Sequence, residues 1–342
     1  MNYLLGKTLG DLEQLAAEQG MPAFAAKQMA QWLYQKRVQD IAAMSNLSLK
    51  CRQNLADNYA VGLSAPCAVQ QSADGTKKYL LEVAGNPLAT IETVYIPSND
   101  RATLCVSSQA GCRMGCTFCA TARMGFVQHL SATDILNQIL SIPESAMLSN
   151  LVLMGMGEPL DNLQAVLQSL QIITAEWGMG WSPTRITLST IGVHSGLVRF
   201  LDETGCHLAV SMHSPFDEER RSLMPMQKAY PIAQTLDIIR RYDWTGQRRV
   251  SFEYILFAGI NDSPKHALAV ARLLQGLECR VNLIRFHALP NSPLRGAGTS
   301  TIEQFQQHLQ RHGVITTVRT SRGEDILAAC GMLATKNREQ NA

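Results

Sequence analysis

From about residue 100 onward, short apolar β-rich runs alternate with segments of helical periodicity, and this alternation restricts the possible folds most strongly. Helix-separated strands of this kind form parallel sheets covered by helices. About six βα units predict an α/β protein with a full or partial parallel (βα)6 barrel over residues 100–335. The strand candidates are TLCVSS (103–108), NLVLMG (150–155), RITLST (185–190), HLAVSM (207–212), RVSFEYILF (249–257), RVNLIRF (280–286) and VITTVR (314–319).

The first 99 residues follow a different pattern. Helical periodicity over residues 1–65 predicts a small helical accessory domain. Residues 66–99 have β character, with KKYLLEV (77–83) and TIETVYIP (90–97) on either side of the turn sequence AGNP, and they predict a β extension that links this domain to the barrel. The last residues, 336–342, form a tail.

Capping residues predict where several helices begin. Thr8 precedes an apolar helical face, and Ser131 leads another. Ser300 and Glu303 have the spacing of a capping box, and Gly313 would end that helix.

Composition excludes several classes of protein. The chain has 30 Lys and Arg against 28 Asp and Glu, so its net charge is only +2 and any contact with a polyanion must depend on a local patch. No apolar run reaches the roughly 18 residues of a membrane span. The N-terminus, MNYLLGKTLGDLEQ, lacks the pattern of a signal peptide, so a cytoplasmic location is expected.

Nine cysteines are present, and three of them, Cys112, Cys116 and Cys119, have the spacing C-x3-C-x2-C. Three thiolates on one short loop suit a cubic [4Fe–4S] cluster, because each binds one iron and the fourth iron stays open. Zinc is the alternative metal, although structural zinc usually takes four ligands. Buried structural cysteines are the third interpretation.

Polar residues recur where the predicted strands end. In parallel barrels, active sites form at the carboxyl ends of the strands. The sequence therefore predicts one active site in the mouth of the barrel, close to the cysteine loop. Its candidate residues are Gly155, Gly157, Glu158, Ser189, Ser211, His213, Arg285, His287 and Cys330.

The cysteine loop, placed directly after the first barrel strand, is similar to that of the radical S-adenosylmethionine (SAM) superfamily. A narrower resemblance covers residues 20–335, through RATLCVSSQAGCRMGCTFCATARMGF, LVLMGMGEPLDN, ITLSTIGV, SMHSP, LMPM, VNLIRF and VRTSRGEDILAACGML. These runs resemble the RlmN/Cfr family of radical SAM RNA methyltransferases, which methylate an adenine ring carbon. The resemblance implies a partial radical SAM barrel that holds one [4Fe–4S] cluster, on Cys112, Cys116 and Cys119, and SAM.

The resemblance also implies roles for three further residues. Cys330 matches the cysteine that SAM first methylates, giving an S-methylcysteine intermediate. A radical from a second SAM would then remove hydrogen from this methyl group, and the carbon radical would add to adenine. Cys105 matches the cysteine that releases the RNA adduct by forming a disulfide with Cys330, and Glu92 matches the proton acceptor. The family SAM contacts match Gly157, Glu158, Ser189, Ser211, Met212, His213 and His287, the last in place of the usual Asn.

The implied substrates and partners follow from the same family. They are 23S rRNA, with tRNA as a further substrate, and an electron donor such as flavodoxin or ferredoxin. The enzyme is expected to be a monomer without membrane contact. The sequence leaves open whether the methyl group goes to adenine C2 or C8. RNA contacts are expected from an aromatic and basic group in the N-terminal domain, namely Lys27, Trp32, Tyr34, Lys36 and Arg37.

Two other functions compete with this interpretation. The first is a different radical SAM activity, such as the activation of a glycyl-radical partner, which would not need Cys105 and Cys330. The second is a non-enzymatic RNA-binding protein with a structural metal centre, which would need neither an open iron nor a SAM pocket.

Overall fold

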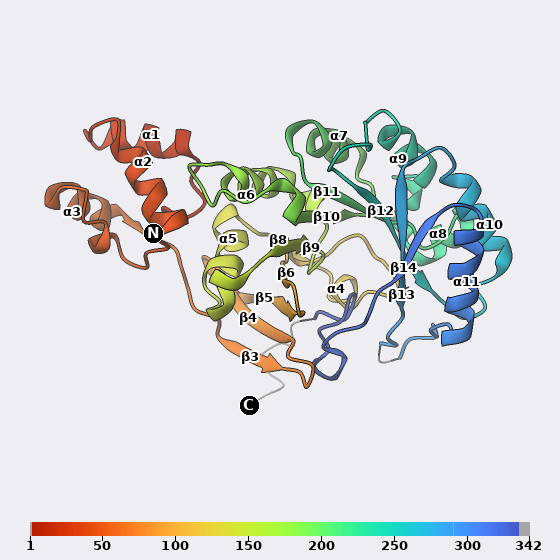
Figure 1. Ribbon diagram of the computed structural model, residues 1–342. Helices are drawn as coiled ribbons and strands as arrows, with labels where there is room; N and C mark the ends of the chain where they lie inside the picture. Colours follow the sequence, from red (N-terminus) through yellow and green to blue (C-terminus); the bar gives the residue numbers. More distant parts are fainter. Residues whose placement is uncertain (1, 290, 335–342) are drawn as a thin grey trace.

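The computed structural model describes residues 2–289 and 291–334, and its centre is one continuous sheet of ten strands (Figure 1). Seven of these strands are parallel and lie side by side in chain order. Each coincides with a run expected from the sequence. They are β6 (Ala102–Cys105), β9 (Asn150–Leu153), β10 (Ile186–Thr190), β11 (His207–Ser211), β12 (Val250–Leu256), β13 (Cys279–Arg285) and β14 (Ile315–Val318).

The remaining three strands keep the parallel strands from closing into a full barrel. β5 (Asn86–Pro97) pairs antiparallel with β6, β4 (Lys77–Val83) with β5, and β3 (Ala68–Gln71) with β4. β6 therefore has β5 on one side and β9 on the other, while β14 forms the opposite end of the sheet. The α/β class and the partial barrel predicted from the sequence are confirmed.

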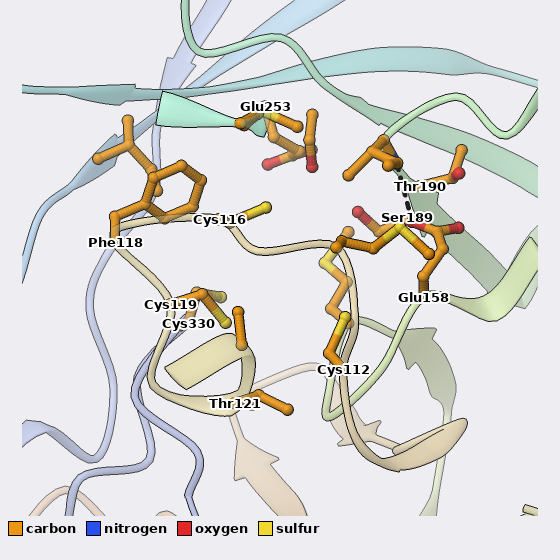
Figure 2. A pocket seen from close by; sticks show the side chains of 18 of the residues that line it. Cys112, Cys116, Phe118, Cys119, Thr121, Glu158, Ser189, Thr190, Glu253 and Cys330 are labelled. Carbon is orange, nitrogen blue, oxygen red and sulfur yellow. Dashed lines mark hydrogen bonds between the residues drawn. The ribbon is translucent and has the colours of Figure 1, made fainter. Parts of the chain in front are cut away.

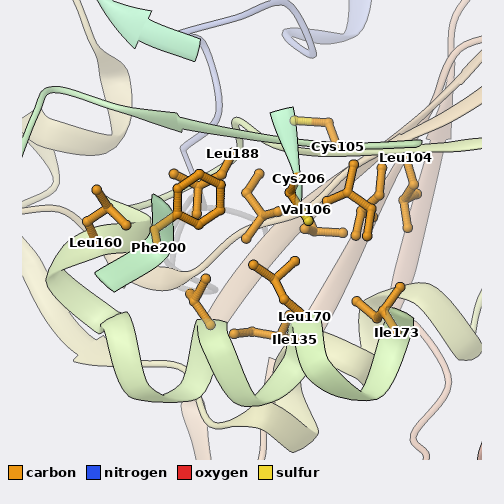
Figure 3. Close-up of a cluster of buried hydrophobic side chains, with 14 of the residues drawn as sticks. Leu104, Cys105, Val106, Ile135, Leu160, Leu170, Ile173, Leu188, Phe200 and Cys206 are labelled. Atoms are coloured by element: carbon orange, nitrogen blue, oxygen red, sulfur yellow. The ribbon is translucent and has the colours of Figure 1, made fainter. Parts of the chain in front are cut away.

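Helices cover the outer side of the parallel strands (Figure 1). Figure 3 shows how the core forms there: Leu170 and Ile173 of one helix and Ile135 of another face Leu104 and Leu188 of the sheet. All five side chains are buried, as the apolar periodicity of these segments requires. The helices are α5 (Ala132–Leu140), α6 (Leu163–Thr174), α7 (His194–Glu203), α8 (Asp217–Leu223), α9 (Ile232–Ile239), α10 (Pro264–Leu273) and α11 (Thr299–Arg311).

The N-terminal segment forms a separate group of helices beside α5 and α6 (Figure 1). The short strands β1 (Asn2–Tyr3) and β2 (Tyr59–Ala60) pair in parallel and bring its two ends together. Tyr34 is 1% exposed and its hydroxyl donates to the carbonyl of Lys7, so its ring belongs to the core and is not available to stack on RNA. The elements are α1 (Leu9–Glu18), α2 (Ala25–Ala30), the π-helical turn η1 (Gln31–Gln35), η2 (Ile41–Ala43) and α3 (Leu49–Asn58).

The predicted helix starts are only partly correct. Thr8 and Ser131 each form a capping box, with Asp11 and Asp134 as the reciprocal acceptors. The box predicted at Ser300 is wrong, because α11 begins one residue earlier, after an extended Gly298.

Short 3-10 turns complete the chain, and none of the described helices is long and apolar enough to cross a membrane. The turns are η3 (Pro143–Met147), η4 (Pro159–Asn162), η5 (Pro183–Arg185), η6 (Pro225–Lys228) and η7 (Glu324–Ile326).

Candidate active site

The cysteine loop lies between β7 (Gln109–Gly111) and the short helix α4 (Ala120–Arg123), which leads into β8 (Phe126–His129). β7 and β8 pair antiparallel and close the base of the loop. Gly111 has φ +73°, and a Cβ there would lie 1.9 Å from the carbonyl oxygen of Gly125, so only glycine fits this crossing. At the far side, the N–H of Thr117 donates to the carbonyl of Leu223 at 3.0 Å. These contacts hold the loop over the carboxyl ends of the strands.

All three cysteines of the loop line one cavity in the mouth of the barrel (Figure 2). Burial raises the pKa of Cys112 to about 12 and that of Cys116 well above its usual value. The neighbouring Cys119 raises both pKa values further, which shows that the thiols lie near one another. The thiols of Cys112 and Cys116 are therefore protonated at neutral pH, and a bound metal group would have to displace their protons.

The donor set fits an iron–sulfur cluster. Within residues 2–289 and 291–334, no three His, Cys, Asp or Glu side chains converge closely enough to hold a single metal ion. A cubic cluster has a different requirement, since each thiolate binds its own iron and the three sulfurs need only face one space. Cys112, Cys116 and Cys119 meet this requirement.

Glu158 lies on the opposite wall of the same cavity (Figure 2). It is 3% exposed, and its carboxylate accepts the N–H of Leu160 at 3.1 Å and that of Ile191 at 2.9 Å. Burial raises the pKa of Glu158 to about 7, although these bonds and the Thr190 hydroxyl act in the other direction. A carboxylate held in this way can receive a cationic amino group, whose charge would restore its ionised form.

Gly157 lets the backbone before Glu158 pass close to β7. Its φ is +101°, and an added Cβ would lie 2.5 Å from Cβ of Gln109. The side chain of Gln109 accepts the N–H of Glu158 at 2.8 Å and donates to Asp161 at 2.7 Å. The glycine-rich strand end is therefore packed directly against the cysteine loop, a closeness that the sequence pattern did not reveal.

The other strand ends place different groups around the cavity. Ser189, Ser211 and His213 line it, whereas Met212 is fully buried behind it. His213 has φ +55°, and its Nδ1 accepts the N–H of Ile255 at 3.1 Å. Burial lowers the pKa of His213 to about 3, so the ring is neutral and its proton is on Nε2. Its ring meets Phe118 edge to face at 4.9 Å.

A second cavity adjoins the first. Cys105 and His287 line the second cavity but not the first, while Cys330 lines both. His287 shares a hydrogen bond of 2.7 Å with the Ser321 hydroxyl, through Nε2, and lies 3.5 Å from Glu324. Thus His287 lies apart from the cavity that holds Glu158 and Ser189. Burial raises the pKa of Cys105 to about 12, and the nearby Cys330 raises it further.

Cys330 lies on a C-terminal segment, residues 323–334, that crosses the mouth after the last strand. The carbonyl of Gly331 accepts the N–H of Ala120 at 2.7 Å, next to the cysteine loop. At its end, the N–H of Ala334 donates to Glu92 at 3.0 Å. Glu92 is 6% exposed and forms an ion pair of 3.1 Å with Lys78. The structure thereby brings Glu92 to the segment that carries Cys330, although Glu92 lines neither cavity.

The sequence analysis did not assign two buried charged residues, Arg220 and Glu253, to the site. Arg220 is 1% exposed and donates to the carbonyls of Ile191 and Ser211, so it ties together the ends of β10 and β11. Glu253 is 3% exposed, lines the first cavity and pairs with Arg319 at 3.2 Å. A carboxylate within the apolar run RVSFEYILF is a usable signal for Glu253. Arg220 lies in an ordinary charged helix and gives no such signal.

Comparisons with known proteins agree with this site. Residues 106–271 match the radical SAM superfamily, and residues 2–61 match the ribosomal RNA large subunit methyltransferase N-terminal domain. The fold and the cysteine loop thus define a radical SAM enzyme, and this class implies a [4Fe–4S] cluster and SAM as cofactors.

Individual relatives narrow this class. The chain is 55% identical to the probable dual-specificity RNA methyltransferase RlmN of Bacteroides fragilis, covering 99% of this chain and 98% of the relative. It is 39% identical to the dual-specificity RNA methyltransferase RlmN of Syntrophus aciditrophicus, covering 97% and 96%. A crystal structure of a radical SAM methyltransferase from Sphaerobacter thermophilus superposes with a TM-score of 0.91 at 39% identity, covering 98% of this chain and 100% of the other. The chain belongs to the RlmN family of radical SAM RNA methyltransferases, and it is a SAM-dependent enzyme.

Proposed function

We propose that this enzyme methylates a ring carbon of adenine in RNA through an S-methylcysteine on Cys330. The observation that carries the proposal is the position of Cys330 in the wall between two cavities. One cavity contains the three loop cysteines, and the other contains Cys105. A sulfur in this wall is accessible from both sides, so it can receive a methyl group in one cavity and meet a second thiol in the other.

The first cavity is the proposed cofactor site. Cys112, Cys116 and Cys119 would hold the [4Fe–4S] cluster, and Glu158 would accept the amino group of SAM. When bound, the cluster and SAM supply radical chemistry that removes a hydrogen atom from an unreactive methyl group. The other proposed SAM contacts are the backbone at Gly157 and the polar groups of Ser189, Ser211 and His213. Met212 and His287 lie outside this set, because neither lines the cavity.

The residues outside the cluster loop carry the later steps. Once the methyl carbon of Cys330 is bonded to the adenine carbon, the ring carries an unpaired electron. It would give up this electron to an acceptor such as the oxidised cluster, and Glu92 accepts the proton from that ring carbon. The sulfur of Cys105 then attacks the sulfur of Cys330. An S–S bond forms and the S–C bond breaks, so its electron pair stays with the methyl carbon, which takes up a proton. The methylated RNA is released, and reduction of the disulfide prepares the next cycle.

The proposed substrates are 23S rRNA and tRNA, and the proposed methylation position is adenine C2. Support for an RNA substrate comes from the curated relatives, which are described as dual-specificity RNA methyltransferases, and support for large-subunit rRNA comes from the matching N-terminal domain; the C2 position is the proposal's own choice over C8. Residues 1–65 would form the RNA-recognition domain, residues 66–99 the β extension and residues 100–335 the barrel, while the expected tail, residues 336–342, lies outside the described residues. In the first of these, the exposed Lys36 lies 3.6 Å over the ring of the half-buried Trp32, which forms a pair of a cation and an aromatic ring.

The proposed enzyme works as a monomer and receives electrons from flavodoxin or ferredoxin. The adenine must leave its stack to reach a site in the barrel mouth, which makes base extrusion part of the substrate requirement.

The test is an assay of the cluster-loaded enzyme with SAM, reductant and unmodified 23S rRNA or tRNA. Nucleoside mass spectrometry should detect 2-methyladenosine, and Cys116→Ala should produce none. Formation of 8-methyladenosine would overturn the C2 assignment. Release of 5′-deoxyadenosine without methylated RNA would favour another radical SAM activity. Absence of both, with RNA still bound, would favour an RNA-binding protein.

A further inference from the structure

The wall between the two cavities contains one charged residue among the described residues that line both. The shared residues are Met154, Ile284, Arg319, Cys330 and Leu333. Arg319 follows β14 directly, and its backbone N–H donates to the carbonyl of Leu283 on β13 at 2.8 Å. The base of this side chain is therefore fixed by the sheet, while its guanidinium reaches into the wall.

A chain of polar groups, of which Glu253 and Asn282 are buried, holds this half-buried guanidinium in place. Its Nε lies 3.2 Å and its Nη2 3.3 Å from the two carboxylate oxygens of Glu253. Glu253 also accepts from Asn282 at 2.8 Å, and Asn282 accepts from Thr317 at 2.6 Å. These four residues cross β12, β13 and β14 inside the barrel. One hydrogen bond from Nη2, together with the closeness of Nε to the second carboxylate oxygen, restricts the orientation of the guanidinium as well as its distance.

Arg319 also interacts with both sulfurs that lie outside the cysteine loop. It hydrogen-bonds Cys330, and its charge opposes the rise in pKa that burial causes at Cys330 and at Cys105. Its Nη1 donates to the sulfur of Met154 at 3.4 Å. One guanidinium thus contacts Met154, just after β9, and Cys330 on the C-terminal segment, and its charge acts on Cys105 at the end of β6.

Correct placement of the two sulfurs is demanding, because a disulfide requires Cβ atoms about 3.8 Å apart and a narrow range of torsion angles. Cys105 is fixed at the end of β6, whereas Cys330 lies on an irregular segment with left-handed residues at Leu327 and Gly331. Something other than a strand must therefore fix the position of Cys330 relative to Cys105.

We propose that Arg319, oriented by Glu253, is a positioning residue that holds the sulfurs of Cys105 and Cys330 within bonding reach of each other. The inference rests on the proposed function, in which these two sulfurs form a disulfide when the RNA is released. It adds to that function the group that brings them together.

The test measures disulfide formation directly, without RNA or SAM. The cluster-loaded protein is incubated anaerobically with oxidised and reduced glutathione, then quenched in acid and alkylated. The Cys105–Cys330 peptide pair is quantified by mass spectrometry. Oxidised glutathione takes up the two electrons and two protons that the thiols lose. The parent protein should form this disulfide, and Arg319→Gln should lower its equilibrium constant about tenfold, the effect of one lost charge-assisted hydrogen bond.

Further variants separate positioning from general stability. Arg319→Lys retains the positive charge but lacks the planar guanidinium, so its disulfide equilibrium constant should lie between those of Arg319→Gln and the parent. Glu253→Gln should also give an intermediate decrease in this constant, because the guanidinium loses its charged partner. Arg285→Gln removes another arginine of the second cavity and should leave the equilibrium unchanged. Iron content and the thermal unfolding midpoint are recorded for each variant.

An equal disulfide equilibrium in Arg319→Gln and the parent protein would overturn the inference, and so would an equal loss in Arg285→Gln. If Arg319→Gln does not fold, the Lys and Glu253→Gln variants decide the question in the same way. A failure of the proposed function would appear elsewhere, as an absence of methyladenosine in the RNA assay.

Discussion

The carboxylate of Glu92 accepts a hydrogen bond from the backbone N–H of Ala334, four residues beyond Cys330. The same carboxylate pairs with Lys78, which lies beside it on the neighbouring strand of the β extension. Glu92 therefore has two separable properties. It anchors the segment that carries Cys330, and it offers a negatively charged oxygen close to the site.

Two substitutions of Glu92 distinguish these properties. Glu92→Gln retains an oxygen that can accept the N–H of Ala334 but has little basicity, whereas Glu92→Ala removes both. We expect both variants to methylate Cys330 and to lose at least about a hundredfold in RNA turnover, the usual range for a missing general base. Single-turnover methylation measured by mass spectrometry checks this. Full turnover by Glu92→Gln would show that the residue acts only as an anchor.

The cluster loop gives the second prediction. Cys116→Ala should abolish iron binding, the absorbance of the cluster near 400 nm, and SAM cleavage. The reason is that the two remaining thiolates can bind only two of the three irons that need a cysteine ligand. Cys279→Ala is the matched control, since this half-buried cysteine begins β13 and lies outside both cavities. Iron per chain and 5′-deoxyadenosine formation are the measurements. A Cys116→Ala protein with full iron content and SAM cleavage would contradict the assignment.

Cys330 and Cys105 act at different steps, which gives the third prediction. Cys330→Ala should keep its cluster but carry no methyl group and produce no methylated RNA. Cys105→Ala should accumulate RNA covalently attached to Cys330, because no thiol can break the S–C bond. Denaturing gels with nuclease treatment detect this adduct, and the double variant should lack it. If Cys105→Ala turns over RNA at the normal rate without an adduct, the S-methylcysteine pathway is refuted.

Much of the barrel could be predicted because its strands are short apolar runs with buried central residues. Such runs stand out in sequence, and all seven were found, with ends that differ by a few residues where the chain leaves the sheet. The predicted start of α11 was wrong because Ser300 has the spacing of a cap, while the extended backbone of Gly298 sets the actual start. A local motif cannot reveal which of two nearby residues, Gly298 or Ser300, the tertiary structure holds extended.

The candidate site was predictable where residues are consecutive or lie at strand ends, as for Cys112, Cys116, Cys119 and Glu158. Its long-range contacts were not. His287 lies outside the first cavity, where it shares a hydrogen bond with Ser321, just before the C-terminal segment. The position of Arg319 in the wall depends on Glu253, which is 66 residues away in the sequence. Neither pairing has a characteristic spacing.

Arg220 gives a prediction about stability. Its guanidinium donates to Met212, Ile191, Ser211 and Tyr230 carbonyls and to Gln227, all inside the protein. Arg220→Met should lower the free energy of unfolding by about 3 kcal/mol, because these buried acceptors lose their donors. Arg221→Met is the control, and its exposed ion pair with Glu218 predicts a change within about 0.5 kcal/mol. Urea unfolding measures both. Equal changes in the two variants would contradict this account of Arg220.

Asp74 gives a prediction about acid stability. Burial raises the pKa of Asp74, but bonds from Thr76, Gly323 and Ser72 outweigh it and lower the pKa from 3.8 to about 2. A depressed carboxylate pKa stabilises the folded state above the unfolded pKa, and this stabilisation is lost as pH falls from 3.8 toward 2.

Asp74→Asn should therefore be less stable than the parent by about 1 kcal/mol at pH 6, and the difference should shrink below pH 4. Urea unfolding across this pH range is the measurement. Asp237→Asn, at an exposed helix position beside Arg240, should differ from the parent by less than about 0.5 kcal/mol throughout. A difference between Asp74→Asn and the parent that stays constant down to pH 2 would contradict the assigned cause.

Because Cys330 follows the last strand, no strand of the sheet belongs to the segment that carries it. A chain ending at Arg322 would retain all ten strands and the complete cysteine loop. Under the proposed function, such a truncated enzyme would still cleave SAM while lacking any methyl carrier. A synthetic peptide spanning residues 323–342, added back in trans, would then make methyl transfer dependent on peptide concentration. Radical generation and methyl delivery would become two halves of a split enzyme.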